Sequence, residues 1–396
     1  VVGTCKLFED AGVGVGSEES FRIMLALKQL ATDHPVTDIH FWGKIFGLEK
    51  DYIIAQCVYK EGEEPQPEES EVDETAGEEK KDDEEGDEKP KSAYIKPKPL
   101  PIEEYGTGVN KYAYFVCNNP GEPWTPLANA TPSAIVASRN ITKFFTGNLN
   151  AKVSSYPPFL MEEKTPTEGH LLRAVIARIS AETHLSPLGM FTFDEEEEED
   201  EDGGRSTYIA DEEYEGVTKS ALLDATMAGW AHHVQYILPQ GRTKWMNPKP
   251  PKGDDEDEDE DEDAEEEEEV EPETGPPLLT PAQEDEPVDD GPAWSTKLTS
   301  QLNSKFAAVV ASSNKWPGAH ALAYQKGKNF ENIYIGYGIA YSAEPYNPPL
   351  PPLPQREFEK TDGTTESADP TVEEEEAFRA EQAKDDEDGD ADEDED

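Results

Sequence analysis

The sequence predicts an α+β protein: a mainly antiparallel β body with an N-terminal docking helix, interrupted by disordered acidic insertions. Three observations predict this class: one apolar helical segment near the N-terminus, several aromatic and β-branched runs separated by turn residues, and four acidic runs. The acidic runs span residues 61–89, 194–202, 254–273 and 385–396 and carry 49 of the 55 net negative charges. The remaining 326 residues are close to neutral, as in a globular body. The runs themselves repel and have too little apolar surface to fold alone.

The same pattern divides the chain of 396 residues into four parts. Each boundary falls where acidic or proline-rich composition replaces apolar runs. The parts are a helix and β-hairpin module over 1–60, an acidic disordered insertion over 61–91, a β-rich body over 92–345 interrupted by acidic loops at 194–204 and 254–290, and a proline-rich then acidic tail over 346–396.

A helix is predicted to begin at Ser17. Its hydroxyl is a favourable cap, and the two glutamates that follow meet the positive end of the helix dipole. The segment SFRIMLALKQLA places Phe21, Met24 and Leu25 on one face, which two further leucines widen. The helix should end before Pro35, because the residue before a proline avoids helical geometry. We therefore expect a docking helix that is buried on most sides.

The predicted strands follow this helix. The run IHFWGKIFGLEKDYIIAQCVYK predicts a β-hairpin over about residues 39–46 and 51–59. KYAYFVCNN alternates well enough to be a strand, and residues 120–159 predict brief strands and loops. In residues 294–341 the runs KFAAVVASS, HALAYQ and NIYIGYGIAY are separated by turn signals, which predicts an antiparallel meander.

The segment HLLRAVIARISAETHLSP, residues 170–187, is ambiguous. Leu172, Val175 and Ile179 fit helical spacing, whereas Val175, Ala177 and Ile179 fit a strand. The neighbouring strands slightly favour a strand.

Two adjacent histidines, His232 and His233, suggest a metal site at first sight. Adjacent side chains on a strand point to opposite faces, and helical ligand pairs lie three or four residues apart. No cysteine is near, and the local acid Asp224 lies eight residues upstream. We therefore expect a structural pair, with one histidine inward and hydrogen-bonded and the other outward. We also expect Trp230 and Ile237 to pack and Arg242 to hold the turn that follows.

No other pattern predicts catalysis or a bound cofactor. The acidic runs do not satisfy an EF-hand loop, and AGVGVGSEES lacks the spacing of a phosphate-binding loop. Three widely spaced cysteines favour a reducing compartment over a disulfide scaffold. No apolar run approaches the roughly 18–20 residues that cross a bilayer. We expect no enzyme activity, no cofactor, no metal, and neither nucleic-acid nor membrane partners.

The proline-rich segment LPPLPQR carries a candidate linear motif. Pro351, Pro354 and Arg356 match the minus orientation of an SH3 ligand, in which the prolines form a polyproline II helix and the arginine meets an acidic loop. Such a segment can equally lie along its own domain, so both readings stay open.

Several long, irregular motifs resemble those of radial spoke head proteins of the 4/6 type. They are FWGKIFGLEKDYIIAQ, WAHHVQYILPQGRTKW, FVCNNPGEPWTPLANATP, RNITKFFTGNLNA and PTVEEEEAF. The resemblance runs from about residue 13 to 378 and skips only the acidic runs. The chain begins with Val and lacks a longer N-terminal region that the resemblance leads us to expect. The candidate interface residues within these motifs are Phe41, Trp42, Gly43, Lys44, Trp230, His233, Pro239, Gln240, Gly241 and Arg242.

The resemblance implies a structural subunit of the radial spoke head in the axoneme of motile cilia and flagella. It implies a paired scaffold of two related or identical subunits that contacts other head and stalk proteins, touches central pair projections transiently, and passes on mechanical signals that regulate dynein-driven bending. The acidic runs would give it a negative surface towards the central pair. The alternative is an acidic binding module, a chaperone or buffer for basic proteins or calcium. That role does not require long aromatic motifs, which indicate specific partner surfaces.

Overall fold

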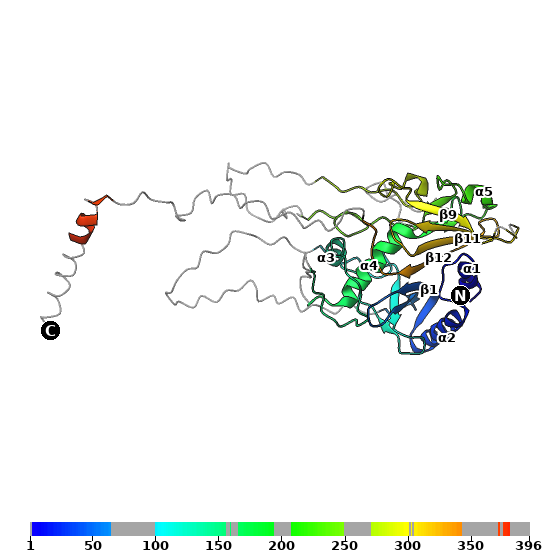
Figure 1. Cartoon of the computed structure of the whole chain (residues 1–396), viewed down its shortest axis with the longest axis horizontal. Helices are drawn as coiled ribbons and strands as arrows, with labels where there is room; N and C mark the ends of the chain where they lie inside the picture. The colour runs from blue at the N-terminus through cyan, green and yellow to red at the C-terminus, as the bar shows by residue number, and fades with distance from the viewer. Residues whose placement is uncertain are drawn as a thin grey trace. The chain divides into compact units, whose positions relative to one another are not determined.

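The structure is a computed structural model of the whole chain (Figure 1). It describes residues 2–64, 100–155, 159, 165–193, 207–248, 271–300, 302, 305–342, 371–372 and 375–380. Two compact units are present, Val1–Pro345 and Tyr346–Asp396. In the second unit, residues 375–380 are helical. All of the sheet structure below belongs to the first unit, which we call the body.

A single eight-stranded sheet, in the order β4-β3-β2-β1-β12-β11-β10-β9, organises the body. Every neighbouring pair is antiparallel except β1 and β12, which are parallel. Its strands are β1 (Val36–Ile45), β2 (Tyr52–Tyr59), β3 (Ala113–Cys117), β4 (Thr125–Pro126), β9 (Trp294–Leu298), β10 (Val309–Ser313), β11 (Ala319–Tyr324) and β12 (Asn329–Gly336). The sheet therefore joins an N-terminal and a C-terminal set of strands.

The parallel joint between the two sets is short. Its register pairs Gly43 with Tyr334, Lys44 with Ile335, and Ile45 with Gly336. A side chain on residue 43 would place a Cβ only 2.0 Å from the Tyr334 carbonyl oxygen. Glycine at this position is therefore required for the two strands to approach each other.

Helices cover both faces of the sheet (Figure 1). Against one face, α2 packs on β1–β3 through Ile23 and Leu30, and α1 packs on β10–β12 through Phe8. On the other face, α4 lies against both strand sets. The helices are α1 (Val2–Asp10), α2 (Ser17–Asp33), α3 (Pro132–Ser138), α4 (Glu168–Thr183), α5 (Lys219–Leu222) and the 3-10 helices η2 (Gly108–Asn110) and η3 (Ala282–Glu284).

A smaller layer covers β9–β11 on the same face as α4. It consists of α5, η3 and the two-stranded sheet of β5 (Leu185–Pro187) and β8 (Trp230–His232). Trp230 is fully buried in its core against Val309 and Ala321. A second short pair, β6 (Phe191–Thr192) and β7 (Ile209–Ala210), lies where the chain enters and leaves residues 194–206.

The predicted α+β class, the N-terminal hairpin, the strand at KYAYFVCNN and the C-terminal meander are confirmed. The helix predicted to begin at Ser17 is also present as α2, but the expectation that it is buried on most sides is wrong, because only five of its seventeen residues are buried. Ile23, Ala26 and Leu30 face the sheet, whereas Phe21 and Leu25 are about half exposed. Apolar residues cover more of this helix than the sheet can bury, so the packed face is set by the sheet and not by the helix pattern. Ser17 is the first helical residue and caps nothing with its side chain.

The slight preference for a strand at residues 170–187 is wrong, because residues 168–183 form α4. Twelve of its sixteen residues are buried, so the polar side that normally marks a surface helix is missing. Only the last three residues of the segment, Leu185–Pro187, form a strand. Helices α1 and α3 were not predicted.

Several predictions fall on residues outside the described ranges: most of the acidic runs, the loop 194–204, the proline-rich motif with Pro351, Pro354 and Arg356, and the acidic tail. Residues 271–290, in the second half of the predicted acidic loop 254–290, are described and pack on the body, where Leu278 and Ala282 are buried. Within the described part of the chain, every helix is too short or too polar to span a bilayer.

Replacing Gly43 with Ala is expected to lower the free energy of unfolding by about 2–4 kcal/mol, because the new methyl group collides with the β12 backbone. Urea unfolding followed by tryptophan fluorescence measures the change. The matched control is Gly3→Ala in α1, where a Cβ meets nothing within 4 Å and the effect should stay below about 1 kcal/mol. Equal stability of the two variants would show that the β1–β12 joint does not hold the sheet together.

Candidate interaction surface

The first sequence signature, Phe41–Lys44, lies at the centre of the fold. Trp42 is buried, donates its indole N–H to the Ser180 hydroxyl on α4 at 2.9 Å, and packs its ring against Tyr334. The Lys44 ammonium lies 2.9 Å from a Glu19 carboxylate oxygen and 3.1 Å from one of Asp51. These residues join α2, the sheet and α4, so their local geometry is that of structural residues.

The second signature forms a turn over residues 237–243 that several distant segments hold. Arg139, at the end of α3, donates to the carbonyl oxygens of Leu238 and Pro239 at 2.7 and 2.5 Å. Arg242 donates to the Pro101 carbonyl, as expected of a residue that holds the turn. Gly241 has φ 87°, and a Cβ there would lie 2.5 Å from the Pro132 carbonyl oxygen.

The remaining members of this signature are also placed by intramolecular bonds. The backbone N–H of Gln240 donates to a Glu273 carboxylate oxygen at 2.9 Å. Pro239 is exposed. Trp230 donates its indole N–H to the Leu222 carbonyl at 3.0 Å. Trp230 and Ile237 are both buried as expected, but in different clusters. The two signatures therefore do not converge on one site.

The paired histidines differ from expectation, because both contact other parts of the body. His232 Nε2 lies 2.9 Å from Asp285, whose carboxylate also accepts the Trp294 indole N–H at 2.6 Å. The His233 ring stacks on His184 with centroids 6.0 Å apart and meets Phe330 edge-on. Among the residues that the structure describes, no three His, Cys, Asp or Glu side chains gather closely enough to hold a metal ion.

Burial lowers the pKa values of the two stacked histidines, His184 and His233. Desolvation, and to a smaller extent His232, lowers the pKa of His184 to about 4. Desolvation and the neighbouring histidines hold the pKa of His233 well below its ordinary value. Both rings are thus neutral in the folded protein near pH 7. The three cysteines are buried thiols, and burial raises the pKa of Cys57 and Cys117 to about 12, which makes both thiols poor nucleophiles.

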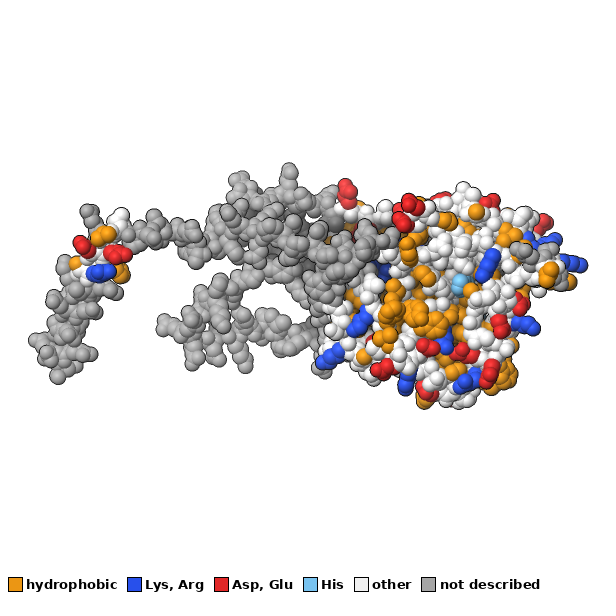
Figure 2. Space-filling view, in the orientation of Figure 1, with side chains coloured by type: hydrophobic (Ala, Val, Ile, Leu, Met, Phe, Trp, Pro, Cys, Tyr) orange, Lys and Arg blue, Asp and Glu red, His pale blue; other side chains and the backbone are white. Residues whose placement is uncertain are grey.

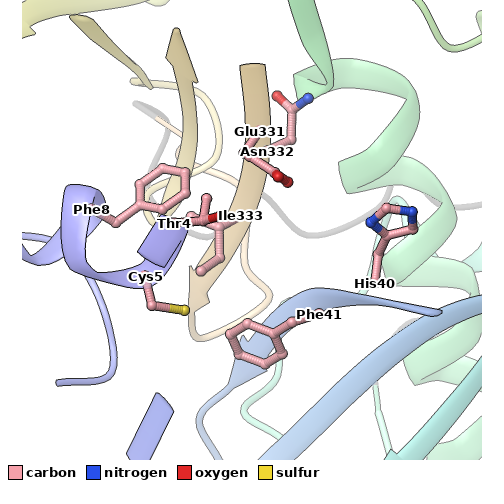
Figure 3. Close-up of a pocket in the computed structure, with 8 residues that line it drawn as sticks. All are labelled: Thr4, Cys5, Phe8, His40, Phe41, Glu331, Asn332 and Ile333. Carbon is pink, nitrogen blue, oxygen red and sulfur yellow. The ribbon is translucent and has the colours of Figure 1, made fainter. Parts of the chain in front are cut away.

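A small cavity of about 50 Å³ lies between α1 and the diverging starts of β1 and β12 (Figure 3). Cys5 and Phe8 of α1 line it on one side, and His40 and Glu331 line it on the strands. Its volume matches one or two water molecules, which is too small for a substrate. The cavity marks the place where pairing between the two strands stops.

An exposed apolar surface lies at the opposite ends of the same two strands. Phe46 directly follows β1 and Tyr337 directly follows β12. The parallel joint therefore brings the centroids of their rings within 5.2 Å of each other. Phe144 meets Tyr337 at 5.3 Å. Leu48, Phe144 and Tyr337 are 71%, 48% and 55% exposed. We call these four residues, Phe46, Leu48, Phe144 and Tyr337, the aromatic platform. Figure 2 shows hydrophobic side chains gathered on the face where Figure 1 shows β1.

Close backbone contacts hold the loops that carry the aromatic platform. The Leu48 amide donates to the Phe145 carbonyl at 2.8 Å. Gly47 and Gly147 both lie against the Lys50 backbone, where a Cβ would come within 2.0 and 2.3 Å of its carbonyl oxygen. Such close backbone packing leaves the loops little freedom.

A buried carboxylate secures the loop that carries Phe144. Glu168 accepts the amide N–H groups of Thr146 and Gly147 at 2.9 Å each. It also accepts the Tyr52 hydroxyl at 2.6 Å, and burial together with this carboxylate raises the pKa of that phenol. The aromatic platform is therefore preorganised, which reduces the entropy lost when a partner binds.

A rigid α+β body that exposes a preorganised aromatic surface is typical of protein-binding scaffolds. The chain matches the family model described as Radial spokehead-like protein over residues 1–376. It is 47% identical to radial spoke head protein 4 homolog A of Homo sapiens, over 95% of this chain and 52% of the relative. It is also 47% identical to radial spoke head protein 6 homolog A of Mus musculus, over 96% of this chain and 55% of the relative.

A more distant relative is flagellar radial spoke protein 4 of Chlamydomonas reinhardtii, at 31% identity over 90% of this chain and 70% of the relative. The chain therefore belongs to the radial spoke head family, and the resemblance drawn from its motifs is confirmed. It spans about half the length of its human and mouse relatives.

The aromatic platform was not among the candidates taken from the sequence. Phe46, Leu48 and Phe144 lie inside two of the quoted motifs, so the motifs contained the signal, but the candidate residues Phe41–Lys44 are buried or half-buried neighbours. Tyr337 carried no distinguishing pattern. The parallel joint brings Tyr337 to Phe46, and backbone bonding of Leu48 to Phe145 adds Phe144; no local pattern encodes either pairing.

The buried His184 ring predicts a specific loss of stability in acid. Because the folded pKa of His184 lies below its unfolded value of about 6.5, the unfolded state binds more protons below that pH. Its contribution is complete above pH 6.5 and falls as the pH drops towards 4. His184→Gln, which cannot charge, should show a shallower loss of unfolding free energy between pH 7 and 4.5 in urea titrations.

The control for this measurement is Thr32→Gln, at an exposed residue of α2 that carries no titratable group. It should leave the wild-type pH dependence unchanged. Parallel curves for wild type and His184→Gln would contradict the assignment of a neutral, buried ring to His184.

Proposed function

We propose that this protein is a structural, non-enzymatic subunit of the radial spoke head in the axoneme of motile cilia or flagella. The observation that carries the proposal is the family match over residues 1–376, together with a rigid, exposed aromatic platform on a fold of that family. Its relatives are named for the radial spoke head and the flagellar radial spoke. The partners that follow are a second 4/6-type subunit, related or identical, and other head and stalk proteins.

The body suits a mechanical role because helix α4, in addition to the β1–β12 pairing, connects its two strand sets. Helix α4 bonds to the N-terminal set through Ser180 and Trp42 and to the C-terminal set through Glu182 and Trp316, whose indole N–H lies 3.0 Å from the carboxylate. A force applied at one edge of the sheet is thereby shared by both sets. The aromatic platform, at the seam between them, is the surface that we assign to a neighbouring spoke-head subunit.

The acidic runs fit a second part of the role, transient contact with central pair projections. Charges of one sign repel only within the screening length of about 8 Å at physiological salt, so the runs act near contact. Repulsion at that range favours brief collisions over adhesion. Under this proposal the runs provide a negative surface through which the spoke head passes on mechanical signals that regulate bending.

Phe144→Ser is expected to reduce incorporation of the protein into axonemes severalfold without unfolding it, because a half-exposed ring supports contacts with a partner more than the protein's own core. Tagged protein is expressed in ciliated cells that lack the native copy, and its amount in demembranated axonemes is compared with that in the soluble fraction. Thermal unfolding of the purified variant verifies the fold.

The matched control is Phe306→Ser, at a phenylalanine that is 73% exposed on the turn between β9 and β10. This variant should enter axonemes normally. Normal incorporation of Phe144→Ser, or an equal loss in both variants, would contradict the role of the aromatic platform.

Replacing the four acidic runs with Gly/Ser segments of equal length, while keeping Glu273 because it holds Gln240, should leave assembly intact but alter beating. The body is near neutral without them, whereas the proposed repulsion from the central pair disappears. Beat frequency and waveform from high-speed video, together with the axonemal amount of the variant, measure the two effects. Unchanged beating in correctly assembled axonemes would rule out a role for the charge.

A further inference from the structure

Phe144 of the aromatic platform lies in an acid-free stretch of a very acidic chain. Residues 123–161, which carry Phe144, contain three cations and no Asp or Glu, although 89 of the 396 residues are acids. Lys50 is exposed near Leu48, and Lys143, next to Phe144, is half-buried and donates to the Ser154 carbonyl oxygen at 2.8 Å. The nearby Asp51 carboxylate is already paired with Lys44. The charge of this surface therefore favours an acidic partner.

An open depression of about 350 Å³ extends the surface on one side of the platform. Its lining is polar and rich in hydrogen-bond donors, with Lys50, Asn148 and Asn150 beside Gly147. One exposed carboxylate, Glu49, also lines it. An apolar platform beside a donor-lined depression fits a peptide that carries large apolar side chains next to carboxylates.

The chain itself contains a segment of this chemistry. PTVEEEEAF, residues 370–378, has four consecutive glutamates between Val372 and Phe378. Val372 and Phe378 are 73% and 61% exposed. Residues 375–380 are helical, and Glu375 pairs with Arg379 at 3.4 Å, so the backbone there already has a regular form. These are exposed apolar side chains without a core to enter.

We infer that the aromatic platform binds the acidic segment 370–380 of a second copy of this chain. Phe378 and Val372 would pack on the platform, while the glutamates would face Lys50, Lys143 and the donor-lined depression. The net charge of −55 makes two copies repel each other where their acidic runs meet, whereas the acid-free segment that carries Phe144 allows approach at the platform. This inference rests on the proposed role as a paired scaffold and names one contact of the pair.

Peptide binding tests the contact directly. A fluorescein-labelled peptide of residues 370–380 is titrated with the full chain carrying Phe378→Ser, which removes the phenylalanine of its own segment. Anisotropy should report binding that weakens about tenfold when Phe144→Ser is added, the scale of one buried phenylalanine. Binding should also weaken with Lys143→Glu and with salt raised from about 0.05 to 0.5 M. Lys28→Glu, on α2, and Phe306→Ser serve as controls without effect.

Complementation in solution tests whether the contact joins two copies. Sedimentation velocity should show self-association of the wild type, and neither Phe144→Ser nor Phe378→Ser alone should self-associate. An equimolar mixture should restore a dimer, because one variant keeps an intact platform and the other an intact segment. Thermal unfolding confirms that each variant is folded.

Absence of peptide binding, or binding that Phe144→Ser leaves unchanged, would overturn the inference, as would a mixture that stays monomeric. The proposed function is judged separately. If Phe144→Ser is lost from axonemes while the peptide fails to bind, the aromatic platform serves another partner and only the contact with segment 370–380 is wrong.

Discussion

The three-residue parallel pairing between β1 and β12 is the constraint on which the body depends. It joins Gly43 to Tyr334, residues separated by most of the chain, and turns two antiparallel sets of strands into one sheet. Long-range pairing of this kind carries a high entropic cost, which extensive burial around the joint offsets. The same pairing ends both strands at one place, and that coincidence brings Phe46 and Tyr337 together as an exposed surface.

Buried carboxylates pin the irregular segments around this joint. Glu103 accepts the amide N–H groups of Val109 and Thr243 at 2.8 and 2.9 Å, and Glu168 holds the loop at Thr146 in the same way. Neither carboxylate has a cation within salt-bridge distance among the described side chains. Several N–H and O–H donors offset the free-energy cost of burying each carboxylate. Removal of one donor would therefore destabilise the fold. Acidic residues therefore serve inside the body as acceptors that connect distant loops.

The sequence allowed most local elements to be predicted and few of the long-range relations. The hairpin and the meander follow from alternation and turn residues, which are local signals. Helix α4 was missed because burial on nearly all sides removes its polar stripe, so Val175 and Ile179 fit either period. The exposure of Phe21 on α2 and the seam that positions Tyr337 both depend on which strands become neighbours. Such information is distributed over the whole chain, so motifs identified the family more reliably than they identified the surface.

Under the proposed contact, the distribution of charge would give this surface its selectivity. Most of the net charge lies in a few runs, and repulsion between like-charged chains limits nonspecific contact wherever those runs are near. A rigid apolar platform bordered by Lys50 and Lys143 is a local exception to that repulsion. Because electrostatic attraction is screened beyond about 8 Å, the cations guide an acidic partner only at short range, and the fit of its apolar side chains then decides whether it stays. Under the proposed contact, charge would limit approach near the acidic runs, and packing would select the partner at the end of β1 and β12.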